Sequence, residues 1–334
     1  MFRLSLIACC LLILCSCRDE FTLEGDYQDI PVAYAFLNPD DDRHFVRVQK
    51  AFLQAGGNAE TNAAIADSIY YDSGEATVLI ENLTESLITE LERVNGEDFG
   101  LDREDGVFAT SPNILYSVRD DVFDLEGGDD IRLLVTRPGQ PDAIAETKII
   151  NPIEINRPID LIRVDDYDRQ LTMTWSKEEG AAIYDITIFM DIRELFPSDP
   201  SRNRDIRLEW KLANGFVPGG EQSSDNLVRF DVSNESFYQF IGNNLEPEDD
   251  VIRRFQNFDL RISAAGQAVL DRRRQENANA GLTSSQALPA YTNLIGGIGM
   301  ITSTVATLRN DIQIDGGSLD SLENGIHTRN LGFR

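Results

Sequence analysis

Two runs of alternating apolar and polar residues follow one another early in the chain. Residues 30–37 (IPVAYAFL) and 43–53 (RHFVRVQKAFL) are separated by the turn sequence NPDDD at 38–42. Strand-forming runs separated by such turn residues predict a β-hairpin. Similar runs continue to residue 150, giving about seven strands in about 120 residues, a density typical of a β-sandwich. The further runs lie at 75–82, 86–96, 114–120 and 131–150, with a turn at 138–141.

The second half of the chain begins with a proline-bounded stretch, residues 151–158 (NPIEINRP), which we interpret as a linker between two domains. Beyond it, residues 171–192 resemble fibronectin type III-like domains. The resemblance rests on Trp175 on one strand, the small residues Ala181 and Ala182 after a short loop, and Tyr184 opening the next strand. It implies a second β-sandwich, with the large Trp and Tyr rings buried inside.

Helical periodicity interrupts the second β-region. Ser233 is a plausible helix N-cap, and Phe237, Phe240 and Ile241 follow at helical spacing, which predicts a helix over 233–245. Another short helix is expected over residues 267–277. The remaining predicted strands lie at 205–213, 226–232 and 258–266, the last with Phe258, Leu260, Ile262 and Ala264 facing inward.

The N-terminus carries an apolar run, residues 4–14, that is too short to cross a bilayer, which needs roughly 20 apolar residues. Its length is that of a signal-peptide core. Residues 14–16 (LCS) before Cys17 resemble a bacterial lipobox, which implies a diacylglycerol on the Cys17 sulfur and cleavage just before it. Residues 18–20 (RDE) resemble the tract that directs Bacteroidota lipoproteins to the outer face of the outer membrane. An ordinary cleaved signal with incidental cysteines stays open.

Together these patterns predict a mainly β protein with two β-sandwich domains of the immunoglobulin/fibronectin type III-like kind, the second with short helical insertions. The expected organisation is a signal peptide (1–16), a lipid-anchored tether (17–29), an N-terminal β-sandwich (30–150), and a fibronectin type III-like β-sandwich with helices and a C-terminal tail (151–334).

Charge and cysteine content restrict the partners. The chain has 57 acidic and 30 basic residues and a net charge of −27. This argues against nucleic acid, whose binding depends on Lys and Arg neutralising phosphates. All four cysteines lie within the first 17 residues, so the body has no disulfide, thiol nucleophile or Cys-based metal site.

Candidate chemistry is sparse. The two histidines, His44 and His327, lie near opposite ends, which gives poor support to a hydrolytic triad or a zinc site with several His ligands. His44 shares a strand face with Val46 and Val48, so we expect a structural role. No cofactor is expected apart from Ca²⁺, for which carboxylates on turns are the candidate ligands. These candidates are Asp40, Asp41, Asp42, Asp129, Asp130, Asp165, Asp166 and Asp168.

Two further motifs have local explanations. The run 296–299 (GGIG) lacks the spacing of a phosphate loop, because Thr302 stands where the last Gly is needed. Tight backbone packing or a bulge between strands is the expected reason for these glycines. The basic run Arg272, Arg273 and Arg274 is expected to pair with nearby acids or to touch an acidic partner.

Several stretches together resemble a family of uncharacterised Bacteroidota outer-membrane lipoproteins. They are residues 29–53, 258–267, 282–303 and 327–333. The resemblance implies an outer-membrane lipoprotein that works beside a TonB-dependent transporter, and offers no catalytic residues. We therefore expect a protein that binds rather than catalyses, as a transporter accessory or a surface adhesin. The rivals are a surface glycan hydrolase that uses two carboxylates and a purely structural envelope component.

Overall fold

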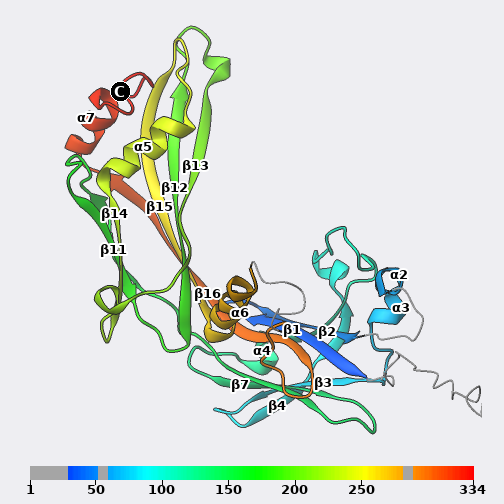
Figure 1. The fold of residues 1–334 in the computed structure, drawn as a ribbon. Coiled ribbons are helices and arrows are strands. Elements are labelled where there is room, and N and C mark those ends of the chain that lie inside the picture. The colour runs from blue at the N-terminus through cyan, green and yellow to red at the C-terminus, as the bar shows by residue number, and fades with distance from the viewer. Residues whose placement is uncertain (1–28, 52–58, 281–288) are drawn as a thin grey trace, which may run out of the picture.

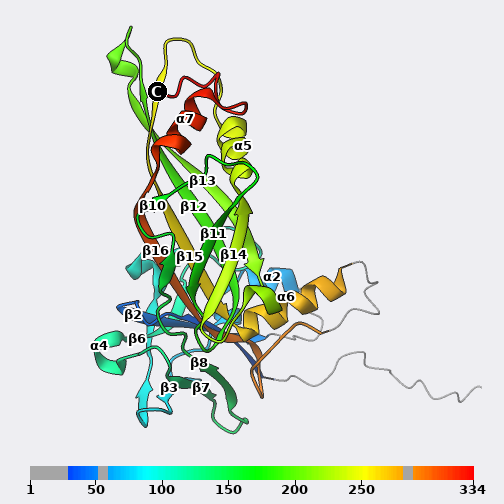
Figure 2. The ribbon, with the colours of Figure 1, turned by 90° about the vertical axis from the view of Figure 1, so that its left-hand side faces the viewer.

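The computed structural model describes residues 29–51, 59–280 and 289–334. They form two lobes, each around its own hydrophobic core (Figures 1 and 2). The core of the N-terminal lobe uses residues between 33 and 149 together with Leu294 and Ile301. The core of the C-terminal lobe uses residues between 150 and 333. The predicted signal peptide, Cys17 and all of the tether but Asp29 lie outside the described residues.

Two sheets make up the N-terminal lobe. One contains the predicted hairpin, which is confirmed: its strands pair antiparallel, with Ala33 opposite Val48. Because Val46, Val48 and His44 alternate with outward residues, all three are buried, as the sequence predicts. The first sheet holds β1 (Ile30–Leu37), β2 (Arg43–Ala51), β6 (Ile114–Arg119) and β5 (Glu92–Asn95); the second holds β4 (Leu87–Glu90), β3 (Thr77–Asn82), β7 (Asp130–Thr136) and β8 (Ala143–Lys148).

The C-terminal lobe is likewise a two-layer β structure. The ring centroids of Trp175 and Tyr184, one from each layer, lie 5.3 Å apart in the core, and both side chains are buried. The predicted inward Trp–Tyr arrangement is therefore confirmed. The larger layer holds β13 (Arg204–Phe216), β12 (Ala181–Leu195), β15 (Ile252–Gly266) and β16 (Ile298–Ile314); the smaller holds β14 (Leu227–Ser233), β11 (Gln170–Ser176) and β9 (Ile155–Arg157), and β10 (Leu161–Ile162) pairs with β16.

Strand β16 runs through both lobes. Its first part pairs parallel with β1, from Val32 opposite Ile298 to Leu37 opposite Ser303. Its second part pairs antiparallel with β15, so one sheet continues in the order β13-β12-β15-β16-β1-β2-β6-β5. The ranges predicted for the two domains, 30–150 and 151–334, are therefore not self-contained, because a C-terminal strand completes the N-terminal sheet.

Gly299 makes this parallel pairing possible. Its φ is +129°, and a Cβ there would lie 1.8 Å from the carbonyl oxygen of Ala33 on β1. Only a residue without a side chain allows the two backbones to approach this closely. The tight packing expected for the run 296–299 is thus confirmed.

The helices are short and lie mainly at the ends of strands. The predicted helices at 233–245 and 267–277 are confirmed as α5 (Asn234–Asn244) and α6 (Gln267–Asn279). No helix within the described ranges is long and apolar enough to cross a membrane. The others are α2 (Ala59–Ala63), α3 (Ala66–Ile69), α4 (Asp120–Phe123), α7 (Gly316–Asn324) and three 3₁₀ helices, η1 (Gly96–Phe99), η2 (Pro200–Arg202) and η3 (Gly220–Gln222).

Two segments are more ordered than the sequence predicts. The predicted linker contains strand β9, and Ile153 in it is buried in the C-terminal core. The predicted C-terminal tail forms α7 and then packs, with Leu331 and Phe333 buried. The polar composition of the tail hid these two apolar anchors. The predicted class, a mainly β protein of two β-sandwiches with short helical insertions in the second, is confirmed.

Candidate binding site

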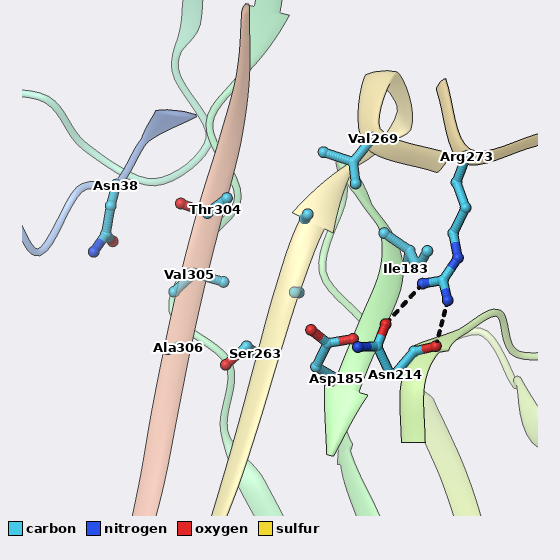
Figure 3. A pocket seen from close by; sticks show the side chains of 12 residues that line it. Asn38, Ile183, Asp185, Asn214, Ser263, Val269, Arg273, Thr304, Val305 and Ala306 are labelled. Carbon is cyan, nitrogen blue, oxygen red and sulfur yellow. Dashed lines mark hydrogen bonds between the residues drawn. The ribbon is translucent and has the colours of Figure 1, made fainter. Parts of the chain in front are cut away.

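A cavity of about 420 Å³ opens where the two lobes meet (Figure 3), and we call it the waist pocket. Helix α6 forms one wall, the outward face of the β12-β15-β16 sheet forms the floor, and Asn38 after β1 borders the N-terminal side. The lining residues come from six places in the chain: Asn38, Ile183, Asp185, Asn214, Ser263, Ala264, Ala265, Val269, Arg273, Thr304, Val305 and Ala306.

Arg273 is held in the pocket by Asn214 on β13. Its guanidinium donates from Nη1 to Asn214 Oδ1 at 3.1 Å and from Nη2 to the Asn214 carbonyl at 2.8 Å. Gly215, with φ +80°, lies directly beneath; a Cβ there would stand 1.6 Å from Arg273 Nη1. Gly215 also donates its N–H to Asp185 Oδ1 at 2.6 Å. Gly215 therefore leaves room for the Arg273 guanidinium and bonds to Asp185.

Helix geometry explains why one arginine of the basic run reaches the pocket. Val269 and Arg273 are four residues apart and therefore lie on the same face of α6. Both line the cavity. Arg272 instead donates to Glu276 at 2.8 Å, and Arg274 lies 3.5 Å from Asp271. The expectation that the run pairs with local acids is confirmed for these two residues.

The lining combines opposite charges with neutral hydrogen-bonding groups. Asp185 supplies an anion and Arg273 a cation, while hydroxyls come from Ser263 and Thr304. Small side chains on β15 and β16, Ala265 among them, leave the space above the sheet open. Such a set of groups can bind a polar ligand that offers both donors and acceptors.

The calcium candidates occupy three separate turns. At the β1–β2 turn, Asp41 Oδ1 accepts from Asn38 Nδ2 at 3.1 Å. Before β7, Asp129 is buried and its Oδ2 accepts from Asn82 Nδ2 at 2.7 Å and from the Glu126 N–H at 3.0 Å. These carboxylates hold the turns of the chain together. Asp40 and Asp42 flank Asp41 in the first turn, and Asp130 Oδ1 lies 3.2 Å from Lys148 Nζ.

The third turn, before β11, is held by two arginines. Arg163 Nε donates to Asp165 Oδ1 at 2.7 Å, and this bond lowers the pKa of Asp165. Arg169 Nε lies 3.3 Å from Asp166 Oδ2, and the Asp168 N–H donates to Asp166 Oδ1. Across ranges 29–51, 59–280 and 289–334, no three His, Cys, Asp or Glu side chains are grouped so that they could hold a metal ion.

The two histidines each meet one carboxylate. His44, buried at the start of β2, has its Nε2 2.8 Å from Asp120 Oδ1 in the N-terminal lobe. His327 Nε2 lies 2.9 Å from Glu235 Oε1 on α5 in the C-terminal lobe. They are in different lobes and serve separate contacts, in agreement with the structural role expected for His44.

Asp191 on β12 has a raised pKa, which is the direction that a general acid needs. Burial raises the pKa of Asp191 on β12, with repulsion from Asp259, Asp205 and Asp311 adding to it. Arg207 opposes the shift, because its Nη1 lies 3.0 Å from Asp191 Oδ2 while its Nη2 donates to Asp259 Oδ2 at 2.5 Å. The guanidinium of Arg207 therefore favours the ionised form of Asp191.

Sequence reasoning identified one waist-pocket residue, Arg273, and only as part of its basic run. Asp185, Asn214, Ser263 and Thr304 carry no local motif, since each stands alone on its strand. Asp185 and Ser263 stand at outward positions of their strands, but so do Asp191 and Arg261, so the sequence does not distinguish them as pocket residues.

Comparison with known proteins leaves the family open. No protein-family model matches the sequence, and no curated protein matches it. A crystal structure of DIP-gamma IG1+IG2 is 7% identical, covers 83% of this chain and 97% of its own, and has a TM-score of 0.18. A crystal structure of CBD12 from CALX1.2 is 9% identical, covers 82% and 98%, and has a TM-score of 0.17. Scores this low support no argument about function.

Proposed function

We propose that the protein is an outer-membrane lipoprotein, anchored through Cys17 and facing the cell surface, that binds rather than catalyses. The waist pocket carries the binding part of the proposal, because it brings Asp185 and Arg273 together with uncharged polar groups in an open cavity. The sequence at 14–17 supports the anchor, and the resemblance to Bacteroidota lipoproteins supports a role beside a TonB-dependent transporter. A surface adhesin would use the same pocket.

Residue Asp29 supports the tethered arrangement. Tyr71 donates to Asp29 Oδ1 at 2.7 Å, and Arg137 donates to the Asp29 carbonyl at 2.5 Å. Eleven residues lie between Cys17 and Asp29, a reach of at most about 40 Å if that stretch is extended. A chain of this length keeps the body near the membrane while its charge of −27 opposes contact with an anionic surface.

The anchor is tested by Cys17→Ala in the native host. We expect the variant to leave the membrane fraction and to lose acyl labelling, because the thioether can no longer form. Membrane retention equal to that of the unchanged protein would refute the anchor.

The binding role is tested by affinity capture from solubilised outer membranes. We expect the unchanged protein to recover a TonB-dependent transporter and Arg273→Ala to recover much less of it. Arg272→Ala is the matched control, since Arg272 bonds to Glu276 on its own helix. Equal recovery by both arginine variants would remove the waist pocket from the binding surface, and recovery of no transporter would remove the accessory role.

The rival activity, carboxylate-based glycan hydrolysis, is supported by the raised pKa of Asp191 beside Asp259. It predicts that the purified protein releases reducing ends from surface glycans and that Asp191→Asn abolishes the release. We rank it second because Arg207 binds both carboxylates, whereas glycan cleavage needs one of them protonated.

A further inference from the structure

Strand β13 ends the large sheet of the C-terminal lobe and lies along its outer margin (Figure 1). Within the described part of the chain it pairs with β12 alone. Residues 204–211 of this edge pair with β12 without a shift of register and contain neither Pro nor Gly. Proline and bulges are common means of blocking edge pairing, so the free side of β13 can accept another strand.

The two faces of β13 differ. Ile206, Leu208 and Trp210 point toward the core but are only partly buried at the margin of the sandwich. Asp205 and Lys211 point outward, with 73% and 69% of their side chains exposed. A strand added at this edge would cover the exposed part of the apolar row and meet the charged row.

The sequence of β13 is self-complementary about Leu208. In an antiparallel pair of two β13 strands with Leu208 opposite its own copy, residue positions that sum to 416 face each other. Arg207 then stands opposite Glu209, and Asp205 stands opposite Lys211, so each outward pair joins opposite charges. On the inward face, Ile206 stands opposite Trp210 and Leu208 opposite Leu208.

We propose that β13 docks on β13 of a second copy of this chain, forming a two-fold dimer with one sheet continuous across both molecules. A two-fold axis requires the same surface on both partners, and the charge order Asp-x-Arg-Leu-Glu-x-Lys at 205–211 satisfies that requirement. The outer pair, Asp205 opposite Lys211, carries the charge match, because Arg207 already binds Asp191 and Asp259 on its own sheet. Asp205 Oδ2 accepts from Arg193 at 2.5 Å, and a carboxylate can accept several further donors.

Charge reversal gives a direct test. Asp205→Lys places two lysines opposite each other at both ends of the strand pair, and Lys211→Glu places two carboxylates opposite each other there. In an equimolar mixture, a mixed dimer with one copy of each variant again has opposite charges facing each other at both ends of the strand pair. Sedimentation equilibrium of the full chain in density-matched detergent should show a dimer for the unchanged protein and for the mixture. Each variant alone should dissociate about tenfold more readily.

Arg254→Glu controls for charge reversal on the same sheet, because Arg254 is exposed on β15, two strands from the edge; it should leave the dimer unchanged. Thermal melts check that all variants remain folded. An unchanged protein that is monomeric at every concentration overturns the proposal, as does a mixture that associates no better than the separate variants. Weakening by Arg254→Glu equal to that by Lys211→Glu would likewise overturn it, since the effect would then not depend on the edge.

Discussion

Arg253 donates from Nε to Glu194 Oε1 at 2.7 Å, and both side chains are buried in the C-terminal lobe. The same guanidinium donates from Nη1 to the Leu331 carbonyl at 2.6 Å and from Nη2 to the Glu246 carbonyl at 3.0 Å. One buried cation therefore joins β12, the loop before β15 and the C-terminal segment. Each of its three nitrogens therefore donates a hydrogen bond to an acceptor within the fold.

Removal of Arg253 should be costly. Arg253→Ala leaves Glu194 buried with Arg204 as its remaining ion partner, at 2.5 Å, and breaking a buried pair costs about 3 kcal/mol. We expect denaturant unfolding to show a loss of that size. Hydrogen exchange should also quicken at the C-terminal end, because Leu331 loses its donor.

The neighbouring Arg254→Ala provides the control, since Arg254 is exposed and surface substitutions change stability by about 0.5 kcal/mol or less. Similar losses from the two substitutions would mean that the buried pair contributes nothing specific to stability.

Gly299→Ala should weaken the junction between the lobes. The new methyl group would overlap the Ala33 carbonyl, and the φ of +129° is one that alanine avoids. The pairing of β1 with β16 must then open, and we expect a loss of about 3 kcal/mol or more in the free energy of unfolding. Loss of cooperativity in the melt would further indicate that the lobes unfold separately.

Gly106→Ala is the matched control, because a Cβ at Gly106 would have no other atom within 4 Å and the backbone there has no positive φ. It should leave the melting temperature unchanged or slightly raised. A stable Gly299→Ala variant would show that the close approach of the two strands is dispensable.

The alternation of apolar and polar residues predicted which side chains of a single strand are buried. Phe258, Leu260, Ile262 and Ala264 alternate in β15, and all four are buried as expected. The parallel pairing of β1 with β16 escaped prediction because its partners are some 265 residues apart in the chain. Residues 299–303 are buried on both faces, so no alternation marks their register.

Strand alternation in the sequence predicts the burial of Glu194 but not that of Arg253. Glu194 has the same parity as Ile192 and the other inward residues of β12, so an inward acid was visible in the sequence. Arg253 has the opposite parity to Phe258 and appears outward by alternation. A bulge, at which Asp191 faces Asn257 but Ile192 faces Phe255, shifts the register and turns Arg253 inward. A bulge of this kind leaves no mark in the sequence.

Stability should fall at high pH through a buried tyrosine. Burial raises the pKa of Tyr184 to about 12, whereas an unfolded tyrosine titrates near 10. The folded protein therefore holds its proton while the unfolded chain loses it, so this contribution is complete below pH 10 and is lost as pH rises toward 12. The loss amounts to about 2 kcal/mol at pH 12.

Tyr184→Phe removes one of the tyrosines whose pKa burial raises, while Tyr71 and Tyr238 remain, and should reduce the decline in melting temperature between pH 9 and pH 12. Tyr34→Phe, at a partly exposed position on β1, serves as the control and should keep the decline of the unchanged protein. An unaltered pH profile in Tyr184→Phe would assign the alkaline loss to other groups.

Calcium should leave the described fold unaffected. To coordinate the ion at 165–168, Asp165 and Asp166 would have to release Arg163 and Arg169. Asp129 would have to release Asn82 in a buried position, which leaves a polar group unpaired at a cost of about 1–3 kcal/mol. We therefore expect identical melting temperatures in CaCl₂, in EDTA and in NaCl of matched ionic strength. A rise specific to CaCl₂ would restore these carboxylates as ligands, and its loss in Asp165→Asn but not in Asp41→Asn would identify the turn responsible.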